Sequence, residues 1–480
     1  MAIHTPEWVK DAIFYQIFPD RFARGSKSQG PSNLEAWDAP PTLRGFKGGD
    51  FAGMLERLDY LTELGITAIY FNPIFQSAAN HRYHTHDYFR VDPILGGDEA
   101  FLEFLHAAHA RGIRVILDGV FNHASRGFLQ FNHLMENGAQ SPYVDWFKVE
   151  SFPLNAYEEG AKPNYACWWD IRELPKLNTE TAAVREFLFR VAEHWLKLGI
   201  DGWRLDVPLE ISTPGFWEEF RRRVKAINPE AYILAEIWHE AGEWLQGDTF
   251  DATMAYGFNR ACYSFFGGEA LDTTERPGGF QLRPYGAYSF ARAVRELLTS
   301  YNEQVTQVQY NLLSSHDEPR FLTMVHGDRR RLLLATLFQM SFPGTPSIYY
   351  GDEIGMEGGR DPDCRRGFPW QGEYWDQALL QAFQDLVQMR KAHAALRRGS
   401  FTQLHAKGRA YAFARQLGGE TLVVAVNAGE QPASISFRAP RLSAPAARWD
   451  TLFGSSPLRG SDGTLEVELP ALAGGAWIAR

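Results

Sequence analysis

The chain has 480 residues, and its 58 Asp and Glu outnumber its 48 Lys and Arg, which gives a net charge of −10 at pH 7. Nucleic acids and anionic membranes attract proteins with a surplus of positive charge, so no nucleic-acid or membrane partner is expected. Hydrophobic residues make up 45% of the chain and charged residues 22%, which is typical of a folded globular protein.

The three cysteines, Cys167, Cys262 and Cys364, are too few and too scattered for a disulfide framework or a zinc site. The N-terminal residues contain no basic stretch followed by an apolar one, and no run approaches the roughly 18 apolar residues of a membrane span. We therefore expect a cytoplasmic protein.

Short apolar runs alternate with amphipathic segments from near the N-terminus to Ala395. Eight of them have the length and composition of strands, namely Ala12–Phe18, Ile66–Phe71, Ile113–Leu117, Gly202–Leu205, Tyr232–Ile237, Phe250–Ala255, Asn311–Ser315 and Ser347–Tyr350. The segments between them show helical spacing, and Gly112 and Gly199 are placed to end two helices. Repeated strand–helix units predict parallel pairing, and eight units predict an α/β fold of the (β/α)8 TIM-barrel type.

The spacing between the runs is uneven. The segment between the third and fourth runs is much longer than one helix requires, and it is rich in aromatic residues, Pro and Asn. It predicts an inserted subdomain after strand 3, over residues 123–178, with the barrel itself formed by residues 1–122 and 179–396.

After Leu396 the helical spacing fades. Tyr411–Arg415 and Thr421–Val426, separated by a Gly-Gly at 418–419, have the pattern of a β-hairpin, and the segment up to Ala476–Ile478 also has a strand pattern. They predict a small C-terminal antiparallel β-sandwich over residues 397–480.

In a βα barrel the active site lies at the C-terminal ends of the strands, so polar residues that end the apolar runs are the candidates. They are Tyr83 to Asp87 after the second run, Asp118, Asn122 and His123 after the third, Arg204 and Asp206 after the fourth, Glu236, Trp238 and His239 after the fifth, and His316 and Asp317 after the seventh. Each carboxylate alone is more simply explained as a helix cap or an arginine partner. Together, Asp206, Glu236 and Asp317 meet at one end of the barrel, which costs Coulomb energy, so function is the simpler explanation.

Convergent carboxylates suit the cleavage of glycosidic bonds, which needs one acid to protonate the leaving oxygen and one carboxylate to meet the sugar carbon. Arg204 lies on the same strand face as Asp206 and is expected to keep it ionised. Trp238 gives Glu236 a less polar wall, which suits an acid. The two histidines, 123 and 316, fit donors to sugar hydroxyls better than metal ligands, because no third partner is close in sequence.

At these residues the sequence resembles the α-amylase superfamily, glycoside hydrolase family 13, whose members act on α-glucans with retention. Four segments are similar to the signature segments of this family and follow in order: Asp118–His123, Gly202–Asp206, Glu236–His239 and Ser315–Arg320. Leu174–Asn178 and Asp361–Arg365 resemble the group of cyclomaltodextrinases, neopullulanases and maltogenic amylases. The resemblance extends from Asp11 to the C-terminus.

The resemblance implies that Asp206 is the nucleophile, Glu236 the general acid and then base, and Asp317 the residue that holds sugar hydroxyls. It further implies four sets of substrate contacts. Tyr83, His123, Arg204 and His316 surround the sugar on the non-reducing side; Asp361 and Arg365 bind the next sugar outward; Glu210 and Trp238 contact the leaving-group side and influence acceptance of α-1,6 bonds; and Asp87, His239 and Arg320 complete the substrate-binding set.

Two features depart from that group. Its members usually carry an extra N-terminal β domain that pairs subunits, whereas here Trp8 to Ala12 lead directly into the first strand. The resemblance therefore implies a monomer, or a dimer formed by another route, with a more open cleft that favours long linear chains.

The second departure concerns calcium. The group's calcium loop after the first strand is rich in Asn and Asp, but residues 22–29 here offer an Arg and a Lys. A hard cation takes six to eight oxygen ligands, so a structural calcium is doubtful there. Asp50 remains a candidate calcium ligand in this region, and Asn122 is a candidate calcium ligand elsewhere. No cofactor is expected for the chemistry.

The leading hypothesis is a retaining hydrolase of α-1,4 bonds, and of some α-1,6 bonds, in maltooligosaccharides, cyclodextrins, pullulan or starch. One alternative is a transglycosylating or isomerising α-glucosyl transferase, because sequence does not show whether water or a sugar captures the intermediate. Another is a non-catalytic carbohydrate-binding homologue, against which the complete carboxylate set argues.

Overall fold

The structure is a computed structural model that describes residues 3–26, 30–438, 448–461 and 463–480. Eight parallel strands form one sheet in the order β8-β7-β6-β5-β2-β1-β10-β9, and a parallel bridge between Met254 and Tyr310 joins its two ends into a barrel. The strands are β1 (Phe14–Ile17), β2 (Ala68–Phe71), β5 (Arg114–Gly119), β6 (Gly202–Leu205), β7 (Tyr232–Ala235), β8 (Ala252–Thr253), β9 (Tyr310–Leu312) and β10 (Thr345–Tyr349). Each of the eight predicted runs overlaps one of these strands, so the barrel prediction is confirmed.

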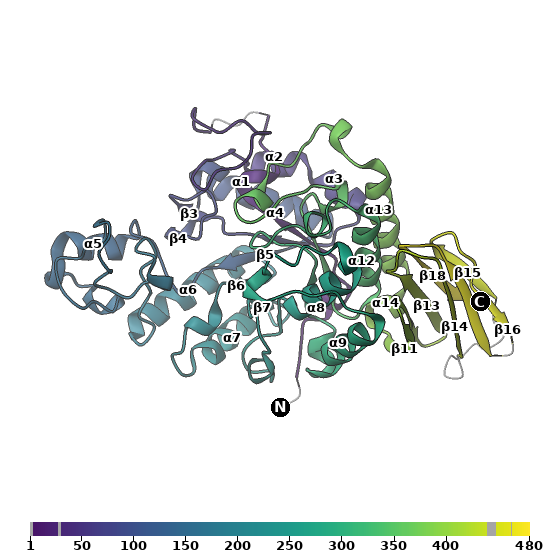
Figure 1. Cartoon of the computed structure of the whole chain (residues 1–480). Coiled ribbons are helices and arrows are strands. Elements are labelled where there is room, and N and C mark those ends of the chain that lie inside the picture. The colour runs from purple at the N-terminus through teal and green to yellow at the C-terminus, as the bar shows by residue number, and fades with distance from the viewer. Residues whose placement is uncertain (1–2, 27–29, 439–447, 462) are drawn as a thin grey trace.

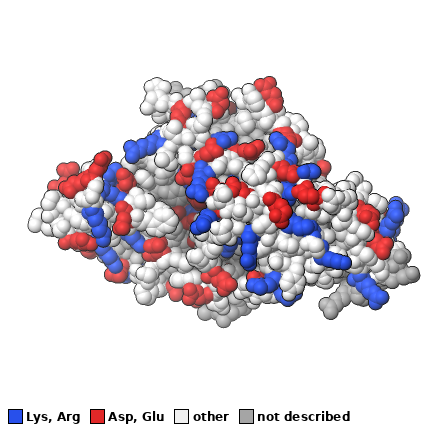
Figure 2. Space-filling model, in the orientation of Figure 1, with Lys and Arg blue, Asp and Glu red and all other residues white. Residues whose placement is uncertain are grey.

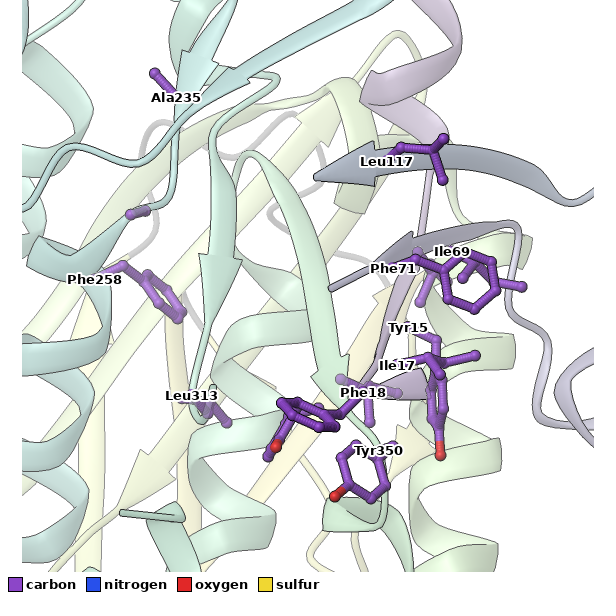
Figure 3. Packing of buried hydrophobic residues seen from close by; sticks show 14 of the residues in the cluster. Tyr15, Ile17, Phe18, Ile69, Phe71, Leu117, Ala235, Phe258, Leu313 and Tyr350 are labelled. Atoms are coloured by element: carbon purple, nitrogen blue, oxygen red, sulfur yellow. The ribbon is translucent and has the colours of Figure 1, made fainter. Parts of the chain in front are cut away.

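The barrel wall separates two apolar layers, because successive residues of a strand point to opposite faces. Phe14 and Ile116 belong to the cluster that fills the barrel interior. The large cluster between the wall and the helices contains Tyr15 and Leu117, which are adjacent to these residues in sequence, and Ile69, which pairs with Tyr15 across the sheet (Figure 3). The barrel is therefore packed on both sides, and its end is the place left for a site.

The helices cover the outside of the barrel (Figure 1). They are α1 (Pro19–Phe22), α2 (Phe51–Glu56), α3 (Leu58–Leu64), α4 (Gly97–Ala110), α6 (Ala182–Leu198), α7 (Phe216–Ile227), α8 (Tyr256–Cys262), α9 (Ala287–Thr299), α10 (Glu303–Thr306), α11 (Phe321–Met324), α12 (Arg329–Ser341), α13 (Gln377–Ala392) and α14 (Ala394–Arg398). Helix α6 buries Val184, Leu188, Val191 and Trp195, which recur at helical spacing on one face. It ends at Gly199, whose φ of 110° is strained for any side-chain-bearing residue.

The segment between β5 and α6 forms a lobe that projects from the barrel (Figure 1). It contains α5 (Leu129–Asn137) and the short 3-10 turns η3 (Gly138–Gln140), η4 (Val144–Trp146) and η5 (Trp168–Asp170). A β-bridge between His123 and Lys176 ties the two ends of the lobe together beside the barrel mouth. A short hairpin, β3 (Phe75–Ser77) with β4 (Thr85–Val91), follows β2.

The C-terminal strands form two antiparallel sheets on the side of the barrel opposite the α5 lobe (Figure 1). One sheet contains β11 (Ser400–Lys407), β12 (Ala410–Leu417), β13 (Glu420–Asn427), β18 (Ala473–Ala479) and β15 (Trp449–Phe453); the other contains β14 (Ala433–Arg438), β17 (Thr464–Leu469) and β16 (Arg459–Ser461). Ala412, Val423, Ile435, Val467 and Trp477 fill the space between the sheets. The predicted antiparallel sandwich is confirmed.

Acidic and basic side chains are interspersed over the face shown in Figure 2. In the described part of the chain, every helix is too short or too polar to cross a bilayer. The three cysteines all lie in that part, and none is joined in a disulfide.

Candidate active site

Side-chain alternation brings the polar cluster to one end of the barrel. Along β5 and β6 the inward positions continue from Ile116 to Asp118 and from Gly202 to Arg204 and Asp206, while Leu234 on β7 leads to Glu236. Asp118 and Arg204 are direct partners in the β5–β6 register. The apolar interior therefore ends in a layer of charged groups at the carboxyl ends of the strands.

Arg204 is the centre of this layer and is 0% exposed. Its Nη1 donates to both carboxylate oxygens of Asp118, at 2.9 and 3.1 Å, and to Oδ1 of Asp206 at 3.1 Å. Its Nη2 lies 3.0 Å from Oε2 of Glu236, which also accepts from Val207 N–H at 3.0 Å. One guanidinium thus holds three carboxylates from three neighbouring strands.

A second group of side chains completes the ring around the barrel mouth. The Tyr83 hydroxyl donates to Asp118 Oδ2 at 2.9 Å and lies 2.7 Å from His316 Nε2, and the two rings are stacked. His316 Nε2 lies 3.1 Å from Asp317 Oδ2, and Arg365 reaches Asp317 Oδ1 at 3.5 Å. Arg365 also pairs with Asp361 at 2.9 Å. These contacts connect Asp317 to Arg204 through Tyr83 and Asp118.

Burial dominates the electrostatics of the carboxylates. It raises the pKa of Asp206 well above its ordinary value, the Glu236 carboxylate raises it further, and Arg204 opposes both. Burial and Glu236 also raise the pKa of Asp317 to about 7, against the pull of Arg365. Arg204 therefore acts on Asp206 in the expected direction, because it lowers the pKa of this carboxyl against the effects of burial and Glu236.

The two histidines of the cluster are held neutral. Burial lowers the pKa of His123 to about 3, and burial together with Arg365 and Arg204 lowers the pKa of His316 well below its ordinary value. Nε2 of His123 is buried with no hydrogen-bond partner among the described residues. A neutral ring nitrogen in this position is free to exchange a hydrogen bond with a hydroxyl group.

Three predicted residues lie on the side of the cluster where β6 and β7 end. Trp238 donates from Nε1 to Glu236 Oε1 at 3.2 Å and stacks on Tyr256. Glu210 is exposed and pairs with Lys176 of the α5 lobe at 2.8 Å. His239 is exposed and packs edge-on against Phe280.

The chain matches two family models. Residues 16–377 match the alpha amylase catalytic domain, and residues 399–473 match the alpha-amylase C-terminal domain. The chain belongs to the alpha-amylase family. It is therefore a glycoside hydrolase of that family.

Relatives and solved structures of the family agree with this assignment. The chain is 44% identical to a cyclomaltodextrinase from a Bacillus species over 430 residues, which are 89% of this chain and 74% of that protein. It is 41% identical to neopullulanase 2 of Thermoactinomyces vulgaris over 470 residues, which are 97% of this chain and 77% of that protein. Its fold matches the native form of the debranching enzyme from Nostoc punctiforme with a TM-score of 0.93 and 48% identity, covering 99% of this chain and 100% of that chain.

Two predicted substrate-binding residues of this alpha-amylase family member are not brought to the cluster. Arg320 is 0% exposed, donates to Asp352 Oδ1 at 2.8 Å and lies over the ring of Tyr349. It is therefore a buried structural cation beneath the site. Asp87 lies on β4, where its Oδ1 accepts from Phe89 N–H of the same strand.

The surroundings of Asp50 and Asn122 test whether they suit calcium. Asp50 Oδ1 accepts from the N–H groups of Gly25 and Gly53 and caps the N-terminus of α2. Asn122 Nδ2 lies 3.2 Å from His123 Nδ1. Within the described ranges no group of three His, Cys, Asp or Glu side chains is arranged to hold a metal, and residues 27–29 of the predicted loop lie outside those ranges. The hydrogen-bond partners of these two side chains among the described residues are nitrogen groups, whereas a hard cation takes oxygen ligands, so these contacts do not support calcium, and calcium at Asp50 or Asn122 stays a prediction.

Asp118 belongs to a motif that the sequence reveals, but no role in the site was predicted for this residue. In the structure it accepts from Arg204, from the Tyr83 hydroxyl and from the Tyr70 hydroxyl at 2.6 Å. Gln16 was missed as well, and its Nε2 lies 2.9 Å from His316 Nδ1. Both occupy the inward position two residues beyond an apolar inward residue, so strand alternation is the signal that identifies them.

Proposed function

We propose that this chain hydrolyses α-1,4-glucosidic bonds, and some α-1,6-glucosidic bonds, through a covalent glycosyl-enzyme intermediate with retention of configuration. The observation that carries the proposal is that Asp206 and Glu236 both contact the guanidinium of Arg204. Retaining glycosidases need two carboxyl groups only about 5–5.5 Å apart, and two carboxyls on one guanidinium are close neighbours.

In the first step Asp206 attacks the anomeric carbon while Glu236 protonates the leaving oxygen. Arg204 holds Asp206 Oδ1, so we assign the attack to Oδ2. Oε2 of Glu236 is occupied by Val207 N–H and Arg204, so we assign the transferred proton to Oε1, beside Trp238. Asp206 attacks as the carboxylate, and Arg204, which lowers the pKa of Asp206 against the effect of burial, supports that form.

In the second step Glu236 takes a proton from water, and the water oxygen displaces Asp206 from the sugar carbon. Two inversions at one carbon leave the product in the α configuration. Asp317, His123 and His316 are assigned to the hydroxyl groups of the reacting sugar, and Tyr83 to its ring face.

The outer contacts follow from position. Asp361 and Arg365, which pair with each other, are assigned to the next sugar on the non-reducing side. Trp238, Glu210 and His239 lie on the other side of Glu236 and are assigned to the leaving group, where they would affect the choice between α-1,4 and α-1,6 bonds. We propose maltooligosaccharides, cyclodextrins, pullulan and starch as substrates, supported by the relatives named cyclomaltodextrinase and neopullulanase. Cytoplasmic location and oligomeric state stay predictions.

Asp206→Asn and Glu236→Gln test the catalytic assignment. Each change keeps the side-chain shape but removes the group that attacks or transfers a proton, so each should lower kcat on maltotriose by about a hundredfold or more. Circular dichroism should show an unchanged fold. Either variant cleaving maltotriose at the parental rate would refute the assignment.

The products test the reaction type. Maltotriose, pullulan and β-cyclodextrin should each yield linear sugars whose new reducing end appears first as the α-anomer, observed by proton NMR during the first minutes, with or without a chelator. A β-anomeric first product would contradict the covalent intermediate. At high maltose concentration, longer oligosaccharides would identify the transglycosylating alternative, in which a sugar replaces water as acceptor.

A further inference from the structure

Three aromatic rings form a continuous stack that leads from the barrel mouth to the surface of the α5 lobe. The His123 ring stacks on Trp168 with centroids 5.4 Å apart and planes 20° apart. Trp168 in turn stacks on Trp169 with centroids 4.7 Å apart and planes 10° apart. His123 is buried, whereas Trp169 is 77% exposed. We call Trp168 and Trp169 the tryptophan pair.

The turn that carries the tryptophan pair is anchored. Its ends are joined by a β-bridge between Cys167 and Pro175, and Trp168 N–H donates to Leu174 O at 3.0 Å. The Arg172 guanidinium donates to two backbone carbonyl groups elsewhere in the lobe, those of Asn155 and Ala161. The exposed indole is therefore held in place by its backbone.

The backbone of this turn is strained at the exposed tryptophan. Trp169 has φ 49° and ψ 32°, and Asp170 has φ 57°, a conformation that residues with a side chain rarely adopt. Residues held in this conformation are strained, and such residues concentrate at sites that hold a ligand. Trp169 gains one stacking partner from this conformation but buries little of its own ring.

The geometry favours a sugar as the group that completes the stack. Trp168 covers one face of the Trp169 ring, and the large exposed fraction leaves the other face to solvent. The apolar C–H face of a glucose ring packs on a flat indole, and an immobile indole loses little entropy when it binds. The stack begins at His123, which the proposed function places against the reacting sugar. One glucan molecule can therefore contact the catalytic cluster with one glucose unit and Trp169 with another.

We propose that the tryptophan pair is an outer sugar-binding platform. A glucose unit of the α-glucan, beyond the unit that reacts, stacks on the exposed face of Trp169. This inference depends on the proposed function. The outer face of Trp169 is separated from His123 by two stacked ring contacts, of 5.4 and 4.7 Å, so the glucose unit held at the catalytic cluster is not the one that this face binds. The platform is selective for long or branched chains.

Binding to a non-hydrolysing variant tests the platform. In the Glu236→Gln background, the dissociation constants of maltoheptaose and maltotriose are measured by calorimetry with and without Trp169→Ala. Loss of one stacked sugar is expected to weaken maltoheptaose binding roughly fivefold to tenfold relative to maltotriose. Trp169→Phe should keep most of the maltoheptaose affinity, because it retains a flat ring.

Two further variants control for structure. Tyr157→Ala removes another aromatic residue of the same lobe, 69% exposed and lying under Arg126 outside the stack, and should leave the ratio of the two dissociation constants unchanged. Trp169→Gly relieves the strained φ and also removes the ring. It should therefore lose as much maltoheptaose affinity as Trp169→Ala, and the folded protein should be at least as stable as the Trp169→Ala variant. An unchanged ratio in Trp169→Ala, or an equal loss in Tyr157→Ala, overturns the platform. Failure of the proposed function is seen separately, as full turnover by the Glu236→Gln protein.

Discussion

Arg204 shows how one residue sets the properties of its neighbours. It contacts Asp118, Asp206 and Glu236 at once, and it is completely buried. A positive charge divided among three carboxylates only partly offsets the cost of burying them. Burial and Glu236 therefore raise the pKa of Asp206, and Arg204 opposes them.

The free-energy cost of ionising a carboxyl within this cluster predicts that Asp317→Asn stabilises the protein at alkaline pH. The pKa of Asp317 is raised to about 7, whereas in an unfolded chain an Asp has a pKa of about 4. The folded state thus binds this proton more tightly, and stability falls as pH rises from about 4 through 7. Because Asn does not ionise, the variant should be more stable than the parent at pH 8 and about equally stable near pH 4.

Urea unfolding at both pH values measures this difference, and activity should be lost at both. Asp363→Asn is the control, since this carboxylate pairs with Arg366 and its pKa is lowered, so the change should give no gain at pH 8. A loss of stability in Asp317→Asn at pH 8 would show that its pairing with Arg365 outweighs its burial.

At the scale of elements, the start of α2 depends on a single side chain. Asp50 Oδ1 accepts from Gly53 N–H in the first turn and from Gly25 N–H in the segment that follows α1. Both donors are backbone groups, which a hydrogen bond satisfies and a cation does not. The carboxylate therefore connects a helix end to the loop beside it.

Asp50→Ala should lower the free energy of unfolding by about 1–2 kcal/mol, the usual cost of a lost N-cap, while Asp50→Asn should lose much less. Differential scanning calorimetry, with calcium and then with chelator, measures the change. A cap makes the loss equal in both conditions. A loss that appears only with calcium would instead identify Asp50 as a cation ligand.

At the scale of the whole molecule, the barrel and the sandwich share apolar contacts. Phe413 on β12 packs against Phe338 on α12, with ring centroids 5.7 Å apart, and stacks on Phe401 at 4.6 Å. Arg415 is completely buried at this junction and donates to the backbone carbonyls of Ser341 and Gly399. Contacts of this kind predict that the two parts unfold together.

Phe413→Ala should lower the stability of the whole chain by about 3–5 kcal/mol, because it opens a cavity at the junction. The midpoint for loss of activity in urea should fall by as much as the midpoint for loss of tryptophan fluorescence, although Phe413 belongs to the sandwich and the catalytic cluster to the barrel. Phe437→Ala, between the two sheets of the sandwich, should behave in the same way. Two separate transitions, with activity following the unchanged one, would refute joint unfolding.

The sequence supported correct predictions where the signal is local. Chain order and the alternation of apolar runs with amphipathic segments identified the barrel strands, because each strand carries its own pattern. Asp206, Glu236 and Asp317 were predicted to meet because strands of one barrel end on one side. Arg320 was predicted to bind substrate, but it is paired with the buried Asp352. Its motif does not reveal this partner.

The sequence by itself determined the order of the strands, the face on which each side chain lies and the family of the chain, all of which depend on neighbours along the chain. Only the tertiary structure decided how Arg204 is shared, how far burial shifts the pKa of Asp206 and Asp317, and how His123 comes to lie against Trp168. These properties depend on contacts between residues far apart in sequence. They also depend on the exclusion of water from the site, which is achieved only when the whole barrel has folded.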